Sequence, residues 1–263
     1  MEYFAISNGI PVHILDTKKG NTTIVLLHGY LETLYIYNEF IEELEKKYRV
    51  IAIDLPGHGL SGSDKEINSM EFCAKVVADI LKKNCIENAW IAGHSMGGYI
   101  AQNCIKCFPE LFKGLILLNS TPFADAPEKK TAREREIELI RKSKLGNLAA
   151  LSIPNMYAPA NLRKFDEKIE ETVEISETHD PNGIIACIKG MMERGDTKEV
   201  LASAKRAMFI FGTEDKFITE EIREKLIGEF PNVKAVVIPG TGHNSFIEEP
   251  EKVIEAIENF IEQ

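Results

Sequence analysis

Six short, almost wholly apolar runs constrain the fold of this chain most strongly. They are TTIVLL, RVIAID, NAWIAG, KGLILLN, RAMFIFG and VKAVVIPG, and they are rich in β-branched residues. Strands that are apolar on both faces belong in a parallel sheet covered by helices. Segments with helical periodicity separate the runs, so the sequence predicts an α/β fold with a mostly parallel, doubly wound sheet. The expected helices span about residues 35–47, 69–84, 96–107, 220–229 and 250–261.

The start of the chain has a different pattern. Two strands are expected at about residues 3–6 and 10–15, joined through Asn8 and Gly9. An Asn-Gly pair between two strand-like runs is a strong hairpin signal. The sheet is therefore expected to begin with an antiparallel pair.

The alternation of strands and helices breaks between about residues 121 and 205, where the segments are charged and amphipathic. We interpret the charge runs as solvated helix faces, with partner binding as the alternative. The apolar stripes beneath them need a surface to cover, and open α/β sheets bind ligands at the carboxyl ends of their strands. The sequence thus predicts one core, residues 1–120 and 206–263, with a helical cap insertion at 121–205.

Charge and composition exclude several classes of function. The formal net charge of −10 argues against a nucleic-acid partner, because phosphate binding needs a cationic surface. No run approaches the roughly 20 apolar residues of a membrane span, and the first residues lack the features of a signal peptide. We expect no membrane association and a cytoplasmic location.

The five cysteines are expected to be reduced thiols, because their number is odd and most lie in helix-like segments. Cys104 and Cys107 have CxxC spacing, yet no second ligand pair accompanies them. We interpret this pair as helix residues rather than a metal or redox site.

The run IAGHSMGGYI places Ser95 between a predicted strand and a predicted helix, with glycines at 93 and 97. This context is typical of a nucleophile elbow, in which the serine is strained and side chains at the glycine positions would collide. The Met96 amide would lie at a helix N-terminus, where free N–H groups favour negative charge. The competing interpretation is an ordinary helix-capping serine.

A nucleophilic serine needs a base, and the base needs an acid that orients it. Asp215 follows the strand RAMFIFG, and His243 follows the strand VKAVVIPG. Both stand just past the carboxyl ends of parallel strands, at the edge where Ser95 also lies. The three side chains are therefore expected to converge.

Five motifs together resemble the α/β-hydrolase family: HGY at 28–30, DLPGHGLSG at 54–62, GHSMGG at 93–98, GTED at 212–215 and GTGHNSFIEEPE at 240–251. The resemblance implies an eight-stranded, mostly parallel sheet, a cap inserted after the sixth strand, and a triad of Ser95, Asp215 and His243. It also implies an oxyanion hole formed by the backbone N–H groups of Tyr30 and Met96. Many members have proline shortly after the acid, whereas this chain reads DKFIT; the departure leaves the acid in place.

The resemblance and the place of each residue in the predicted elements together give expectations for the other polar candidates. Residues expected to brace loops or turns are His28, His58, His94 and Asp54, while His13 is expected to be uninvolved. His179 is expected to be a helix-capping or surface residue, with a place in the substrate pocket as the alternative. Glu214 is a weaker alternative to Asp215 as the acid.

These features predict a serine hydrolase that cleaves a small carboxylic ester, lactone or thioester through an acyl-enzyme on Ser95. The expected partner is a small-molecule substrate, and no metal or organic cofactor is expected. C–C bond hydrolysis, a menaquinone-pathway-type elimination, a cofactor-free haloperoxidase reaction and a receptor with little turnover remain open, because fold alone does not choose among them. A dehalogenase or epoxide hydrolase is disfavoured, since those relatives have aspartate where this chain has Ser95.

Overall fold

The computed structural model describes residues 1–204 and 206–263, and its sheet confirms the predicted fold class. Eight strands pair in the order β1-β2-β4-β3-β5-β6-β7-β8. The antiparallel pairs are β1 with β2 and β2 with β4, and all remaining pairs are parallel. The strands are β1 (Glu2–Ser7), β2 (Ile10–Asp16), β3 (Thr23–Leu27), β4 (Arg49–Ile53), β5 (Ala89–His94), β6 (Phe112–Leu118), β7 (Ala207–Gly212) and β8 (Lys234–Ile238).

The predicted hairpin joins β1 and β2. Asn8 has a φ of 48° and Gly9 a φ of 91°, so both turn residues have left-handed backbones. Asparagine and glycine adopt this conformation more readily than other residues. A two-residue loop of this kind fits the twist of the strands that it connects.

Both faces of the central strands are buried, as the apolar runs predict. Along β3, Ile24 and Leu26 join one hydrophobic cluster while Val25 and Leu27 join the other, because successive side chains point to opposite faces. The strand β8 differs, since four of its five residues are only half-buried. It pairs with β7 alone and lies at the edge of the sheet.

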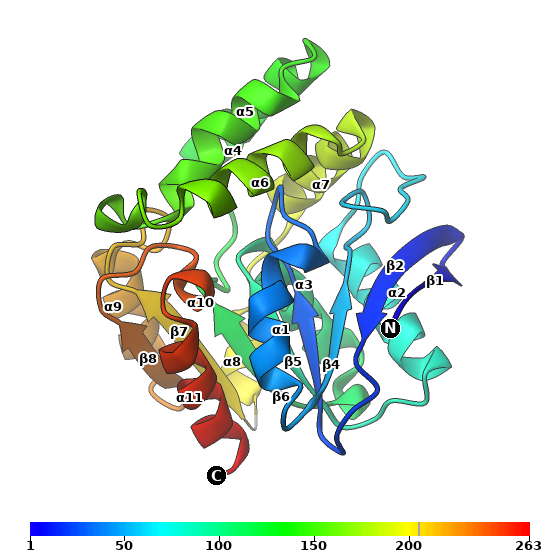
Figure 1. The fold of residues 1–263 in the computed structure, drawn as a ribbon, viewed down its shortest axis with the longest axis vertical. Helices are drawn as coiled ribbons and strands as arrows, with labels where there is room; N and C mark the ends of the chain where they lie inside the picture. The colour runs from blue at the N-terminus through cyan, green and yellow to red at the C-terminus, as the bar shows by residue number, and fades with distance from the viewer. Residues whose placement is uncertain (205) are drawn as a thin grey trace.

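Helices cover the two faces of the sheet. Figure 1 shows α1 (Asn38–Leu44) and α11 (Pro250–Ile261) on the near face, where their apolar residues join the cluster around Trp90. On the other face, α2 (Met70–Lys83) and α3 (Met96–Cys107) supply apolar residues to the larger cluster. The remaining elements outside the 121–205 region are η1 (Leu34–Tyr37), η2 (Pro109–Leu111), α9 (Glu220–Glu229) and α10 (Ser245–Glu248).

The chain between β6 and β7, here called the insertion, is helical throughout its described elements. Figure 1 shows its longer helices grouped beyond the carboxyl ends of the central strands. The last helix, α8, instead contacts α3 on the body of the sheet. These elements are α4 (Pro127–Arg141), α5 (Leu145–Ser152), η3 (Ile153–Met156), η4 (Pro159–Asn161), α6 (Asp166–Glu177), α7 (Pro181–Glu193) and α8 (Lys198–Ser203).

Two further expectations concern composition. The cysteines are all free, with Cys73, Cys104 and Cys187 buried and Cys85 and Cys107 exposed. Across the described residues, none of the helices combines the length and the apolar character that a bilayer crossing requires.

Candidate active site

Ser95 occupies a sharp turn between β5 and α3. Its φ of 48° and ψ of −112° lie outside the regions that serine ordinarily adopts. A Cβ atom on Gly93 would collide with the Gly97 backbone, and one on Gly97 would collide with the Leu27 carbonyl. Close backbone approach therefore requires glycine at both positions. The Ser95 side chain keeps partial exposure, as an attacking group must.

Asp215 and His243 lie at the ends of β7 and β8 and contact each other directly. Asp215 Oδ2 is 2.8 Å from His243 Nδ1, and both residues are buried. Burial alone would raise the pKa of Asp215, but the charge and hydrogen bond of His243, with further hydrogen bonds including one from Asn119, lower it to about 2. The carboxylate is therefore ionised at neutral pH and can hold the imidazole in one orientation.

His94 connects this pair to the Ser95 turn. The His94 ring lies 4.9 Å from the His243 ring, and its Nε2 is 3.1 Å from the His243 carbonyl oxygen. The other ring nitrogen of His94 lies 2.9 Å from the buried carboxylate of Glu32. His94, the residue that precedes Ser95, thus packs directly against His243. This is a bracing contact of the kind expected of it.

The two backbone N–H groups proposed for the oxyanion hole, those of Tyr30 and Met96, are available for hydrogen bonding. Met96 is the first residue of α3, so its N–H has no acceptor inside the helix. Within residues 1–204 and 206–263, neither the Met96 N–H nor the Tyr30 N–H donates to another protein group. Paired free amides of this kind suit an oxygen that becomes negatively charged.

Three of the bracing candidates hold neighbouring loops. The Leu55 N–H donates to His28 Nε2 at 2.9 Å, and the Leu31 N–H donates to His58 Nε2 at 3.3 Å. Asp54 accepts from the N–H groups of Leu34 and Leu60, which is the turn-stabilising role expected of it.

The expectation for His179 is wrong. This residue is only 3% exposed, and its ring lies 5.3 Å from that of His58. It accepts a hydrogen bond from the Gly59 N–H at 3.1 Å instead of capping a helix or facing solvent.

The other two polar candidates, His13 and Glu214, lie as expected apart from the hydrogen bond between Asp215 and His243. His13 contacts the Asp54 carboxylate at 2.8 Å from the first hairpin. Glu214 is exposed, whereas Asp215 is the acid that contacts His243.

Asn119 is a site residue that sequence reasoning missed. Its side-chain N–H groups donate to Asp215 Oδ2 at 2.9 Å and to the Gly242 carbonyl at 3.1 Å. Its amide oxygen accepts from Ser245 Oγ at 2.6 Å. The only signal was its position at the carboxyl end of KGLILLN, the same edge on which the other candidates lie.

An aromatic ring from the loop after β7 and a lysine from the insertion lie near His243. The Phe217 ring lies 4.7 Å from the His243 ring, and Lys129 Nζ lies 5.4 Å from the centroid of Phe217. The buried Arg133 is already paired, since its Nε donates to Asp125 at 2.5 Å. The positively charged Lys129 therefore lies over the Phe217 ring, and the Phe217 ring in turn contacts the His243 ring.

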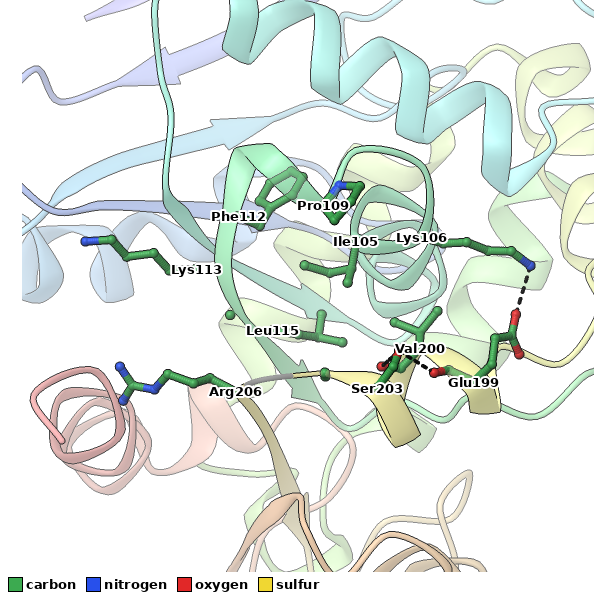
Figure 2. Close-up of a pocket in the computed structure, with 12 residues that line it drawn as sticks. Ile105, Lys106, Pro109, Phe112, Lys113, Leu115, Glu199, Val200, Ser203 and Arg206 are labelled. Atoms are coloured by element: carbon green, nitrogen blue, oxygen red, sulfur yellow. Dashed lines mark hydrogen bonds and ion pairs between the residues drawn. The ribbon is translucent and has the colours of Figure 1, made fainter.

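A separate cavity of about 400 Å³ lies at the amino ends of β6 and β7, opposite the strand ends that carry Ser95. Figure 2 shows it between the end of α3, the start of β6 and α8, with Ile105, Phe112 and Val200 in its wall. Lys106 at its rim pairs with Glu199 at 2.9 Å. Because Ser95 lies at the carboxyl ends of the strands and this cavity at their amino ends, the cavity is not part of the candidate active site.

The sequence resembles curated hydrolases over most of its length. The uncharacterised hydrolase YugF of Bacillus subtilis is 28% identical over 258 residues, which cover 92% of this chain and 90% of that protein. A pimeloyl-[acyl-carrier protein] methyl ester esterase of Yersinia enterocolitica is 24% identical over 250 residues, covering 93% of this chain and 95% of that protein.

A solved structure and a family model are also similar to this chain over most of its length. A thermophilic esterase from Thermogutta terrifontis matches with a TM-score of 0.92 at 28% identity, over 100% of this chain and 98% of that chain. A model of the alpha/beta hydrolase fold matches residues 22–250. Because that match spans most of the sequence, the chain belongs to the alpha/beta hydrolase fold family.

Proposed function

We propose that this protein is a serine hydrolase that cleaves a small carboxylic ester, or a related lactone or thioester, through an acyl-enzyme on Ser95. The observation that carries the proposal is the buried Asp215–His243 pair, which packs against His94 next to Ser95, a residue with a strained backbone. The free N–H groups of Tyr30 and Met96 support it, because acyl transfer develops negative charge on the carbonyl oxygen. The esterase names of the Yersinia and Thermogutta relatives favour ester hydrolysis over the other reactions of this fold.

In the proposed mechanism, His243 Nε2 takes the hydroxyl proton as Ser95 Oγ attacks the ester carbonyl carbon. The N–H groups of Tyr30 and Met96 then hydrogen-bond the oxyanion of the tetrahedral intermediate. Asp215 keeps the imidazole oriented and stabilises its cationic form. His243 returns the proton to the leaving alcohol oxygen as the C–O bond breaks and the acyl-enzyme forms.

The second half of the reaction repeats these steps with water. His243 removes a proton from the water as its oxygen attacks the acyl carbon, and Ser95 Oγ leaves with the proton that His243 donates. The products are a carboxylic acid and the free enzyme. This sequence uses side chains and backbone amides of the chain itself.

We propose further that the insertion is a cap over this site, with the predicted limits of residues 121–205. Two contacts support this role. Ser176 of α6 donates to the carbonyl of Leu31, next to Tyr30, at 2.6 Å. The N–H of Asn244, next to His243, donates to the Met156 carbonyl at 2.9 Å. The segments that carry Tyr30 and His243 thus both contact the insertion, as a substrate-enclosing element must.

The test compares wild type with Ser95→Ala on p-nitrophenyl esters from acetate to decanoate. We expect turnover that peaks at one chain length in wild type and is lost in the variant, while the two proteins melt at similar temperatures. An active Ser95→Ala variant would contradict the assignment of the nucleophile.

A fluorophosphonate probe separates the nucleophile from the choice of substrate. Attack by Ser95 Oγ forms an O–P bond and expels fluoride, so intact-mass analysis of wild type should show one adduct that Ser95→Ala lacks. If the adduct forms but no ester is cleaved, the nucleophile stands and the ester specificity is wrong. C–C bond substrates would then be tested next.

A further inference from the structure

The turn that carries Tyr30 is held at its next residue, Leu31, from two sides. The Leu31 N–H donates to His58 Nε2 at 3.3 Å, and the Leu31 carbonyl accepts from Ser176 Oγ at 2.6 Å. The same Ser176 hydroxyl lies 2.7 Å from the Thr172 carbonyl, so its one proton is shared between the two acceptors. Leu31 has a φ of 65°, a left-handed conformation that leucine adopts only when its surroundings impose it. His58 belongs to a loop of the core, whereas Ser176 belongs to α6 of the insertion.

The other N–H groups of this turn are already used. The Gly29 N–H donates to the Glu32 carboxylate at 2.6 Å, and the Glu32 N–H donates to the Gly29 carbonyl at 3.4 Å. In the turn, the Tyr30 N–H is the one left without an acceptor in the described chain. The Leu31 N–H belongs to the peptide that shares the Tyr30 α-carbon with the Tyr30 N–H, and the Leu31 carbonyl belongs to the next planar peptide. Contacts that fix Leu31 on both sides therefore also limit where the Tyr30 N–H points.

His58 can accept from Leu31 only while its Nε2 carries no proton. The side chain is buried, and its Nδ1 lies 3.6 Å from Cys187 Sγ of α7. Burial, reinforced by the neighbouring His28 and His179, holds the pKa of His58 well below its usual range. The ring is therefore neutral at physiological pH, as this hydrogen bond requires.

The insertion also holds the loop that carries His58. The Gly59 N–H donates to His179 Nδ1 at 3.1 Å. On the other side of His58, Gly57 approaches α7 so closely that a Cβ would lie 2.7 Å from the Gly183 carbonyl oxygen. Both contacts on Leu31 thus depend on the insertion, directly through Ser176 and indirectly through the His58 loop.

We propose that Ser176 and His58 are positioning residues for the oxyanion hole, and that the insertion thereby sets the reaction rate without contributing a catalytic side chain. This inference rests on the proposed function, in which the Tyr30 N–H stabilises the oxyanion. Loss of the Ser176 hydroxyl removes one hydrogen bond from the buried Leu31 carbonyl and loosens the turn. The substrate contacts made elsewhere in the site are unchanged, so the effect falls on the transition state.

The test pairs Ser176→Ala with the control Thr172→Val. Thr172 lies one turn earlier in α6, is also buried, and donates its hydroxyl to the Lys168 carbonyl of its own helix at 2.7 Å. Each variant therefore removes one buried hydroxyl from α6, but only Ser176→Ala removes a contact with Leu31. The measurements are kcat and KM on the preferred p-nitrophenyl ester, and amide hydrogen exchange of residues 29–32.

We expect Ser176→Ala to lower kcat about 10-fold, less than the roughly 10²- to 10³-fold cost of deleting an oxyanion donor. KM should stay within about twofold of wild type, because ground-state binding is unchanged. Exchange of residues 29–32 should speed up in Ser176→Ala, and Thr172→Val should match wild type in both measurements. Equal kcat values for the two variants, or unchanged exchange in Ser176→Ala, would overturn the proposal.

The two measurements also separate this inference from the proposed function. If wild type cleaves no ester and forms no fluorophosphonate adduct, the proposed function fails, and the effect of Ser176 on the reaction rate fails with it. Hydrogen exchange then still decides whether Ser176 holds the turn. If wild type is active and Ser176→Ala is indistinguishable from it, the proposed function stands and the positioning role is wrong.

Discussion

Asp215 Oδ2 lies 2.8 Å from His243 Nδ1, with both side chains buried at the carboxyl edge of the sheet. The other carboxylate oxygen accepts from the N–H groups of Phe217 and Ile218 at 2.7 and 3.0 Å. The loop that carries Asp215 therefore fixes the carboxylate independently of its contact with the imidazole. A pKa of about 2 keeps it ionised above strongly acidic pH, so its titration does not set an activity profile near neutrality.

Asp215→Asn should abolish most activity with little change in folding. An amide at this position favours the wrong tautomer of His243, and such a change typically costs about 10⁴-fold in kcat. The control is Glu214→Gln, because Glu214 is adjacent but exposed. Steady-state kinetics on the preferred ester decides between them, and a larger loss in Glu214→Gln would assign the acid to Glu214.

Asn119→Gly should lower kcat about 10-fold, because Asp215 loses one of its hydrogen-bond donors and its position relaxes. Glycine tolerates the φ of 47° at this position, so the change tests the side chain rather than the backbone. Asn8→Gly is a matched control, since Asn8 has a φ of 48° in the exposed first hairpin. Equal kcat values in the two variants would remove Asn119 from the site.

The features that sequence could predict are those that a local pattern encodes. Gly93, Ser95 and Gly97 predict a strand-to-helix turn because they lie between an apolar run and a helical segment, and the apolar runs predict strands buried on both faces. The half-buried state of β8 was not predictable in this way. It follows from the order of strands in the sheet, which leaves β8 at an edge.

Contacts between distant segments were also beyond sequence reasoning. Asn119 gains its role from the ends of β7 and β8, and Ser176 reaches Leu31 across 145 positions of the sequence. His179 looked like a residue near a helix end, but the packing of the insertion on the His58 loop buries it. In each case the type of side chain is ordinary, and its contacts come only from residues that are distant in the sequence.

Gly97→Ala and Gly228→Ala should change stability in opposite directions. Both glycines lie in helices, but a Cβ on Gly97 would collide with the Leu27 carbonyl, whereas Gly228 faces open space. We expect Gly97→Ala to destabilise by about 3 kcal/mol or more and Gly228→Ala to stabilise by about 0.5–1 kcal/mol. Urea unfolding measures both, and a Gly97→Ala protein as stable as wild type would contradict the close approach at the Ser95 turn.

The buried His179 should make the protein less stable as the pH falls from about 6.5 to about 4. Burial, reinforced by His28, lowers the pKa of His179 from 6.5 to about 4, so in this window the unfolded chain binds a proton that the folded chain does not. Stability therefore rises with pH by about 1.4 kcal/mol per pH unit from this residue, or about 3 kcal/mol over the window. His179→Asn keeps an acceptor for the Gly59 N–H but removes the titration, so urea unfolding from pH 4.5 to 7.5 should give a shallower pH dependence. Parallel curves for wild type and variant would show that His179 is protonated equally in the folded and unfolded states, and that the insertion does not bury it as described.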